Sequence, residues 1–317
     1  MISVFLFMYK AADAKSAPVL ANAYNGFAAS ARSAAMGNAG AGLPAARISD
    51  FFYQNPAALA FSEGIEAQCS YKFSNTTHDN PKTLNDVSGN GFASAYIVND
   101  LNSFSWQNLS YENIGIEDYK KETSIKSLSV SSGKQNSAGV GIGVNLSYLY
   151  GWTAQSGLDS CKNPYSNISS GNGFSFDLAF LFPFGENLAL GINLKNVLGF
   201  MFWTDYDYQQ LPFSIKAGLG YCNKTFSLAF DWDKRFYRFG NLDDDFFYLG
   251  LEQYVIDDVF CLRAGTQTAD FDKNKSVYTY GAGIKLKKVT FAFSVCENQI
   301  FNEKTTTYLI SVASAIS

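Results

Sequence analysis

The dominant pattern of this sequence, from Gly64 to the C-terminus, is an alternation of apolar and polar residues with a period of two. In the clearest run, 140–148, Val, Ile, Leu and Tyr occupy the even positions, while Gly, Asn and Ser stand between them. The segments 174–182, 226–232 and 289–295 repeat the pattern with Phe, Leu, Val and Trp at alternate positions. Because successive side chains of a strand point to opposite faces, this period predicts a chain of β-strands.

The spacing of these segments predicts an all-β fold, a transmembrane antiparallel β-barrel of fourteen strands. The odd-numbered connections, such as 75–90 and 152–170, are long, whereas even-numbered ones, such as 223–224, are tight turns. Long loops on one rim and short turns on the other are typical of outer-membrane barrels. A soluble two-sheet sandwich also alternates, but it has no reason to sort its loops in this way. The predicted strands span 64–73, 91–98, 102–111, 122–132, 137–151, 171–183, 187–199, 209–222, 225–235, 245–256, 258–269, 276–287, 289–298 and 305–313.

The composition supports a barrel and argues against other classes. Aromatic residues make up 16% of the 317 residues and charged residues only 16%, a mixture that arises when lipid-facing and lumen-facing positions alternate. No apolar run reaches the roughly 18 residues that a membrane-spanning helix needs. The net charge of −4 argues against a nucleic-acid partner, since such proteins carry basic patches.

Catalytic and metal-binding chemistry has no pattern in this sequence. The five cysteines form no CxxC motif, and because they are odd in number and scattered we interpret them as small apolar filler. The single histidine, His78, lies in a polar connection without a triad spacing of Ser or Asp around it. The sequence therefore predicts no cofactor, no metal site and no enzyme.

Two pairs of opposite charges fall into register when the tight turns are used to align neighbouring strands. With the turn centred on Asn223-Lys224, Lys216 lies opposite Asp231 on the lumen face. The turn between the tenth and eleventh predicted strands likewise places Glu252 opposite Arg263, again on the lumen face. We interpret both pairs as braces of the wall, and a ligand-binding role for these charges is the alternative.

The alternation slips by one residue in the third predicted strand. Phe104 and Trp106 share one phase, whereas Leu109 takes the other. Such a slip indicates a β-bulge, which bends a strand and leaves the hydrogen-bond ladder locally unpaired. We therefore predict a kink at Trp106, Gln107 and Asn108. The alternatives are a strand that is simply amphipathic near its ends and a misplaced strand boundary.

The stretch 26–61 differs from everything after it, because it is rich in small residues. Met36-Gly37 and the glycines that follow allow a short helix and turn to pack tightly inside a narrow lumen. Asn55-Pro56 ends the extended run and starts a helical turn, since Asn caps free amides and Pro fits the first helical position. A processed leader or an Ala-rich linker is the alternative interpretation.

Short motifs along the chain resemble those of one family. Near the N-terminus they are Ala31-Arg32, Met36-Gly37, Ala39, Ala41 and Asn55-Pro56-Ala57. Further along they are Leu211-Pro212-Phe213, Gly250-Leu251-Glu252 and Leu262-Arg263-Ala264-Gly265. Together they resemble the FadL family of outer-membrane transporters for long-chain fatty acids and other hydrophobic compounds, a group that includes PorV-type barrels.

The resemblance implies a hatch, or plug, at 15–62 inside a barrel at 63–317. A fatty acid or another small hydrophobic compound would displace the plug and leave sideways through the kinked wall. Arg32 and Asp50 would tie the plug to the wall. The residues implied to gate the plug are Arg32, Met36, Gly37, Asp50, Asn55, Pro56 and Ala57.

The same resemblance implies a location and partners. Residues 1–14 combine a short apolar core with a small-residue end, and we predict that they form a signal peptide. We expect a monomer in the outer membrane of a diderm bacterium, in contact with its lipid and with a hydrophobic small molecule. The alternative function is a plugged barrel that binds a protein partner in secretion or surface assembly.

Overall fold

The computed structural model describes residues 29–43, 52–78, 91–116, 119–158, 164–236, 244–256, 259–269, 276–300 and 303–316. The predicted signal peptide and Asp50 lie outside the described residues, and both stay predictions. In the described part of the chain, no helix is long and apolar enough to cross a membrane.

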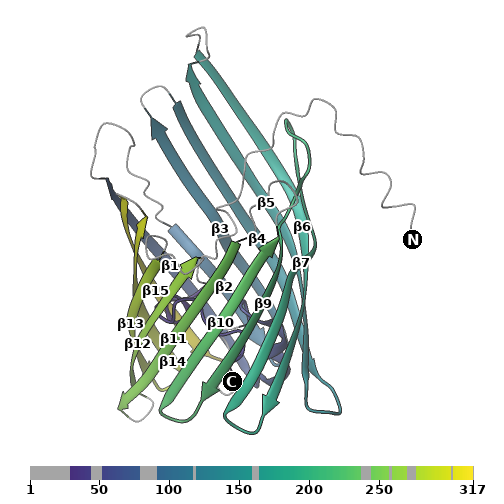
Figure 1. Ribbon diagram of the computed structural model, residues 1–317, viewed down its shortest axis with the longest axis vertical. Coiled ribbons are helices and arrows are strands. Elements are labelled where there is room, and N and C mark those ends of the chain that lie inside the picture. Colours follow the sequence, from purple (N-terminus) through teal and green to yellow (C-terminus); the bar gives the residue numbers. More distant parts are fainter. Residues whose placement is uncertain are drawn as a thin grey trace, which may run out of the picture.

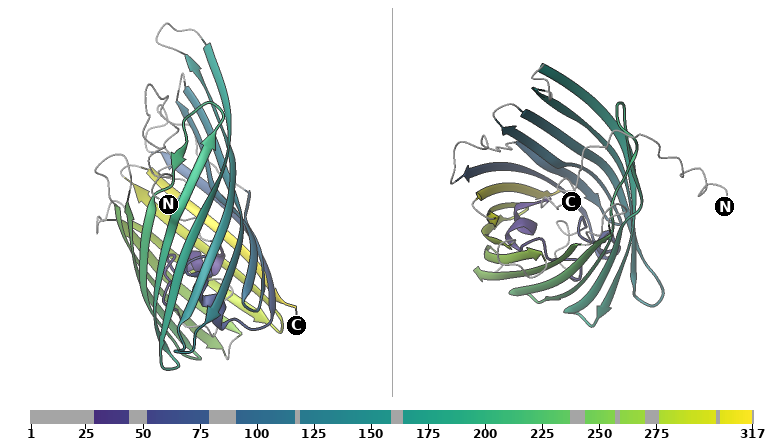
Figure 2. Two further views of the ribbon diagram at one scale, coloured as in Figure 1. Left: turned by 90° about the vertical axis from the view of Figure 1, so that its right-hand side faces the viewer. Right: turned by 45° about the horizontal axis from the view of Figure 1, so that its top comes forward.

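The described chain forms a closed barrel of fourteen antiparallel strands, which confirms the predicted all-β barrel and its number of strands (Figures 1 and 2). The strands pair in sequence order, and the last closes on the first, with Glu66 opposite Ala315. A two-residue strand, β8, pairs with β7 alone. The strands are β1 (Ile65–His78), β2 (Gly91–Asn99), β3 (Asn102–Ile116), β4 (Tyr119–Gln135), β5 (Gly141–Leu158), β6 (Pro164–Phe184), β7 (Leu188–Trp203), β8 (Gln209–Gln210), β9 (Phe213–Cys222), β10 (Phe226–Phe236), β11 (Asp244–Ile256), β12 (Phe260–Ala269), β13 (Ser276–Leu286), β14 (Val289–Ile300) and β15 (Glu303–Ala315).

Proline divides one of the predicted strands. The segment predicted as 209–222 becomes β8 and β9, with Leu211 and Pro212 between them. Proline lacks the N–H group that a central strand donates to its ladder, so the strand is interrupted there. The residues before the proline pair instead with Phe200 and Met201 of β7.

The alternation separates an apolar exterior from a polar lumen. Along β9 and β10, the exposed side chains of Leu219, Tyr221, Leu228 and Phe230 alternate with buried residues. Large apolar side chains on the outside of a barrel form the band that contacts lipid tails. The barrel therefore has the exterior of an outer-membrane protein.

The structure contains one of the two predicted cross-strand pairs and shifts the other. Glu252 lies opposite Arg263. Lys216, however, lies opposite Asp233, and Asp231 lies opposite a glycine. The register predicted for β9 and β10 is therefore wrong by two residues.

A four-residue turn causes this shift. The prediction centred the turn on Asn223-Lys224, but the turn spans 223–226 and is closed by a hydrogen bond from Asn223 N to Phe226 O. The Asn223 side chain also accepts hydrogen bonds from the amides of Thr225 and Phe226, at 2.9 and 2.8 Å. Asn favours such turns because its side-chain oxygen binds nearby amides. The turn centre therefore lies later in the sequence than predicted, which moves each partner by two residues.

Strand β3 has an irregularity where the alternation slips. Its register against β4 shifts between Asn108 and Ser110, so that Leu109 is an extra residue. On its other side, the pairing with β2 ends at Ser94 opposite Gln107, although β3 itself continues. Beyond Gln107, β3 therefore has a paired neighbour on only one side among the described residues.

Residues 29–43 and 52–62, called the N-terminal segment, lie inside the barrel (Figure 2). Helix α1 (Ala31–Ala35) packs against β12, β13, β14 and β15. The 3-10 helix η3 (Pro56–Phe61) packs against β4, β5 and β6. The two helices thus contact opposite parts of the wall.

Both helices of the N-terminal segment begin at polar caps. The side chain of Ser30 accepts a hydrogen bond from the amide of Ser33, and that of Asn55 accepts one from the amide of Ala57. These bonds satisfy amides that have no partner within the helix. Pro56 occupies the first position of η3, where its missing N–H has no cost.

Glycines of the wall allow the backbone of the N-terminal segment to lie directly against the strands. A Cβ added to Gly265 would overlap the backbone at Gly37, and one added to Gly143 would overlap the backbone at Ala57. Gly37 itself has a φ of 63°, a conformation that side chains disfavour. The wall therefore offers space for main chain alone at these contacts.

Replacing Gly265 by Val should displace the N-terminal segment while the barrel still folds, because the new side chain collides with the backbone at Gly37. We expect faster cleavage of the segment by added protease, with unchanged heat-dependent gel mobility of the barrel. Ala264→Val, the next residue along β12 and on its exposed face, is the matched control. Cleavage of Gly265→Val at the wild-type rate would contradict this packing.

Candidate functional site

A buried carboxylate joins the N-terminal segment to the wall. Arg32 Nε and Nη2 donate to Glu252 Oε2 and Oε1 at 2.9 and 2.8 Å. Arg263 Nε donates to Glu252 Oε2 at 2.7 Å. Two-fold donation by a guanidinium to a carboxylate combines charge with a fixed geometry. The ion pair between the wall strands therefore extends to α1.

A second buried carboxylate holds the turn that follows α1. Asp231 Oδ2 accepts hydrogen bonds from the amides of Gly40 and Ala41, at 2.8 and 3.0 Å. Lys216 Nζ lies 3.1 Å from the same oxygen and also donates to the carbonyl of Asn38 at 2.8 Å. Lys216 and Asp231 thus form an ion pair despite the register shift, and both contact the N-terminal segment.

The second half of the N-terminal segment, residues 52–62, is joined by side-chain amides to the first half, residues 29–43, and to the wall. Asn55 Nδ2 donates to the carbonyls of Ala41 and Phe180, at 2.7 and 3.0 Å, so it links both halves of the segment to β6. Lys216 Nζ donates to Gln54 Oε1 at 2.7 Å. One lysine of the wall therefore contacts both halves of the segment.

The predicted gating residues contact the wall in two ways. Arg32 and Asn55 do so through side-chain hydrogen bonds. Met36, Gly37 and Ala57 do so through close packing of their backbone against glycines of the strands. These residues therefore belong to one interface between the N-terminal segment and the wall.

The residues predicted to form a kink lie on both faces of β3. Trp106 is on the outer phase, where its indole N–H donates to the hydroxyl of Tyr150 at 2.8 Å. Asn108 stands at the register shift. Gln107 and the extra residue, Leu109, border a cavity inside the barrel. The irregular part of β3 is thus adjacent to an internal space.

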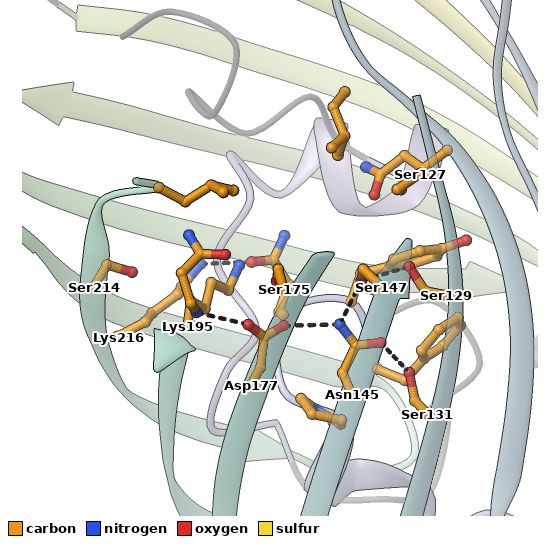
Figure 3. A pocket seen from close by; sticks show the side chains of 18 of the residues that line it. Ser127, Ser129, Ser131, Asn145, Ser147, Ser175, Asp177, Lys195, Ser214 and Lys216 are labelled. Carbon is orange, nitrogen blue, oxygen red and sulfur yellow. Dashed lines mark hydrogen bonds between the residues drawn. The ribbon is translucent and has the colours of Figure 1, made fainter. Parts of the chain in front are cut away.

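This cavity has a volume of about 170 Å³ and lies between the N-terminal segment and the wall (Figure 3). Phe52, Gln54 and Pro56 border it from the segment, and Gln107 and Leu109 border it from β3. It is called the β3 cavity. It therefore contacts both the interior segment and the irregular strand.

The wall of the β3 cavity is rich in hydroxyl groups. The serines come from several strands and occupy alternate positions, so they all face the lumen. They are Ser105, Ser127, Ser129, Ser131, Ser147, Ser175 and Ser214. Sequence reasoning missed them, because a serine in a barrel lumen is ordinarily polar filler, and their alternation along β4 was the available signal.

Part of this hydroxyl wall is joined in a hydrogen-bond chain (Figure 3). Ser131 Oγ donates to Asn145 Oδ1 at 2.9 Å, and Asn145 Nδ2 donates to Asp177 Oδ2 at 2.8 Å. The amide of Asn196 donates to the other oxygen of Asp177 at 2.7 Å. This side of the cavity is therefore held in a fixed arrangement.

A larger cavity of about 1150 Å³ lies on the other side of the N-terminal segment, toward the short turns. Arg32 and Phe61 border it from the segment, and Lys224 and Lys287 border it from the turns. The N-terminal segment therefore borders a cavity on each of its two sides.

Solved structures share this fold over nearly their whole length. The toluene transporter TbuX of Ralstonia pickettii superposes with a TM-score of 0.70 at 12% identity, over 93% of this chain and 99% of that one. The CymD monoaromatic hydrocarbon channel gives 0.69 at 12% identity, over 90% and 96%. A Pseudomonas aeruginosa FadL homologue gives 0.66 at 13% identity, over 91% and 98%. This chain has the fold of the FadL-type barrels.

The family resemblance inferred from short motifs is thus confirmed at the level of the fold. No protein-family model and no curated protein matches the sequence. At this low identity a shared fold does not by itself carry over a substrate. The function must therefore be argued from the residues of this chain.

Replacing Glu252 by Gln should lower the free energy of unfolding by about 3 kcal/mol, because Arg32 and Arg263 then stay buried without their counter-charge. Equilibrium unfolding in guanidinium chloride, with the protein in detergent micelles, measures the change. Asp245→Asn, in the half-exposed pair with Lys234, is the control and should cost less than about 1 kcal/mol. Equal losses for the two variants would contradict the buried ion pair.

Proposed function

We propose that this protein is an outer-membrane transporter of the FadL type that takes up small hydrophobic compounds. The fold shared with TbuX and CymD supports a transporter of this kind. The main observation in favour of the proposal comes from this chain and is the position of the β3 cavity. It contacts the N-terminal segment on one side and the irregular part of β3 on the other.

In this proposal the N-terminal segment acts as the plug. It borders a cavity on each side, so a solute that moves through the lumen must displace it. Hydrogen bonds and ion pairs, such as those of Arg32 and Asn55, connect the segment to the wall. Such bonds exchange for others as a segment moves, so the plug can shift while the strands stay paired. Asp50, predicted to add a further tie, stays a proposal.

Exit through the wall at β3 is the second part of the proposal. Leu109 is an extra residue there, and the ladder between β2 and β3 ends at Gln107 among the described residues. Both residues border the β3 cavity. An apolar solute in this cavity is thus adjacent to a weakly paired part of the wall, and its transfer into lipid is favourable.

The size of the β3 cavity favours a small compound over a long-chain fatty acid. A buried apolar cavity of about 150 Å³ is known to hold benzene. The β3 cavity, at about 170 Å³, is similar in size. We therefore favour ring-sized hydrophobic compounds within the predicted substrate range.

Deleting Leu109 should close the proposed exit, because β3 can then pair with β4 in a single register. We expect uptake of radiolabelled toluene by bacteria that carry the variant in their outer membrane to fall by roughly tenfold, since a closed gate limits the rate. Leu109→Ala keeps the extra residue and controls for the lost side chain. Unchanged uptake by the deletion variant, at an equal amount of folded barrel, would rule out lateral exit here.

Deleting residues 24–61 should leave a barrel that folds but leaks, because the N-terminal segment then no longer fills the lumen. Ion conductance across a planar lipid bilayer measures the leak, with the full-length protein reconstituted in the same way as the control. If the shortened chain forms no barrel, the segment is a structural core rather than a plug. A stoichiometric protein partner on purification, with no bound small molecule, would instead favour the role in secretion or surface assembly.

A further inference from the structure

We propose that the β3 cavity binds a small neutral ring compound that carries a hydroxyl group, such as a phenol, in preference to a hydrocarbon of the same size. This inference rests on the proposed uptake function and narrows its substrate class. Four features of the cavity carry it: serine hydroxyls in its wall without a protein partner, a carboxylate oxygen without a partner, an equal number of opposite charges, and an apolar side that fits a ring.

Three serine hydroxyls in the cavity wall have no hydrogen-bond partner among the described residues. Ser105, Ser127 and Ser214 are only 1%, 3% and 5% exposed, and all three border the cavity (Figure 3 labels the last two). Ser129 and Ser147 in the same wall satisfy each other at 2.7 Å. The hydroxyls of Ser105, Ser127 and Ser214 border the cavity and have no protein partner, so they can bind a ligand there that offers hydrogen bonds.

A carboxylate adds a further acceptor. Asp233 borders the cavity, is 4% exposed, and its Oδ1 has no partner among the described residues. Its Oδ2 accepts hydrogen bonds from Arg235 and from the hydroxyl of Tyr248 only at 3.3 and 3.4 Å. Strong hydrogen bonds to carboxylates are shorter than this. The carboxylate can therefore gain from a hydroxyl donor that a ligand supplies.

The charges around the cavity balance, which favours a neutral ligand. Lys216 is paired with Asp231 at 3.1 Å. Two acids and two bases remain: Asp233 lies 3.3 Å from Arg235, and Asp177 and Lys195 both border the cavity. An added carboxylate or ammonium would disturb this balance in a buried place, where an unpaired charge is unfavourable. The charged groups that border the cavity are Asp177, Lys195, Lys216, Asp233 and Arg235.

The remaining side of the cavity is apolar and suits a ring. Phe52 and Tyr53 of the N-terminal segment lie there in a stacked pair, 4.1 Å apart between ring centroids. Leu149 and Leu211 contribute aliphatic surface. A cavity of about 170 Å³ with one aromatic and one hydroxyl side matches a single ring with a hydroxyl substituent.

Comparing the affinities for phenol and toluene distinguishes this inference from general hydrophobic binding. The two compounds have nearly the same size, and phenol has a hydroxyl group where toluene has a methyl group. Toluene would leave the three serines and the carboxylate oxygen unpaired. A site with buried hydrogen-bonding groups discriminates strongly against an analogue that lacks the matching group.

Isothermal titration calorimetry of the full-length protein in detergent tests the inference, with the heat of ligand partition into protein-free micelles subtracted. We expect phenol to bind roughly tenfold or more tightly than toluene. Benzoate, of similar size but negatively charged, should bind more weakly than phenol.

The triple variant Ser105→Ala, Ser127→Ala, Ser214→Ala should lower the affinity for phenol several-fold and bring the ratio of phenol to toluene affinity toward one. Its affinity for toluene should stay at the wild-type value or rise, because toluene then leaves no serine hydroxyl unpaired, and binding of toluene shows that the barrel has folded. Ser103→Ala with Ser294→Ala is the matched control. These two serines are also buried and unpaired among the described residues, but neither borders the cavity, so the ratio should stay at the wild-type value.

Toluene or benzoate binding as tightly as phenol would overturn the inference, as would an unchanged ratio in the triple variant. If toluene binds and is taken up by cells without any preference for phenol, only this inference fails. If neither ring compound binds and cells that carry the protein take up no toluene, the proposed transport function fails with it.

Discussion

Two carboxylates buried inside the barrel are the constraint on which its interior depends. Glu252 and Asp231 are both fully buried, and a buried charge is stable only when partners surround it. The wall supplies one cation to each, and the N-terminal segment supplies the rest: the guanidinium of Arg32 for one, and the amides of Gly40 and Ala41 for the other. The segment therefore supplies partners for the buried carboxylates of the wall, and these contacts fix where the segment lies.

The packing between segment and wall has the same character. Glycines of the strands, such as Gly265, leave room for main chain but for no side chain. The contact also includes large buried side chains, since Phe52 and Leu59 of the segment pack against Tyr96 and Val98 of β2. The contact fixes the position of the segment in the lumen, as the proposed role of a plug requires.

The β3 cavity connects this interior to the irregular wall. Its apolar side suits a hydrocarbon. Its serine side does not, because unpaired hydroxyls disfavour a purely apolar ligand. The shared fold with hydrocarbon channels and the polar lining of this chain are consistent if the scaffold sets the route and the lining sets the substrate. In this proposal the side chains of Ser105, Ser127 and Ser214 determine which compounds the cavity prefers.

The sequence by itself determined the strands, their even number and the closed antiparallel barrel, because a period of two allows one face for lipid and one for the lumen. It also located the slip in β3 and the capped turn at Asn55. Only the tertiary structure decided that Lys216 and Asp231 hold the N-terminal segment, and that serines of β3, β4 and β9 meet at one cavity. The reason is physical: alternation assigns a side chain to a face of its own strand, but neighbours across the lumen depend on the turn lengths, the closure and what fills the barrel.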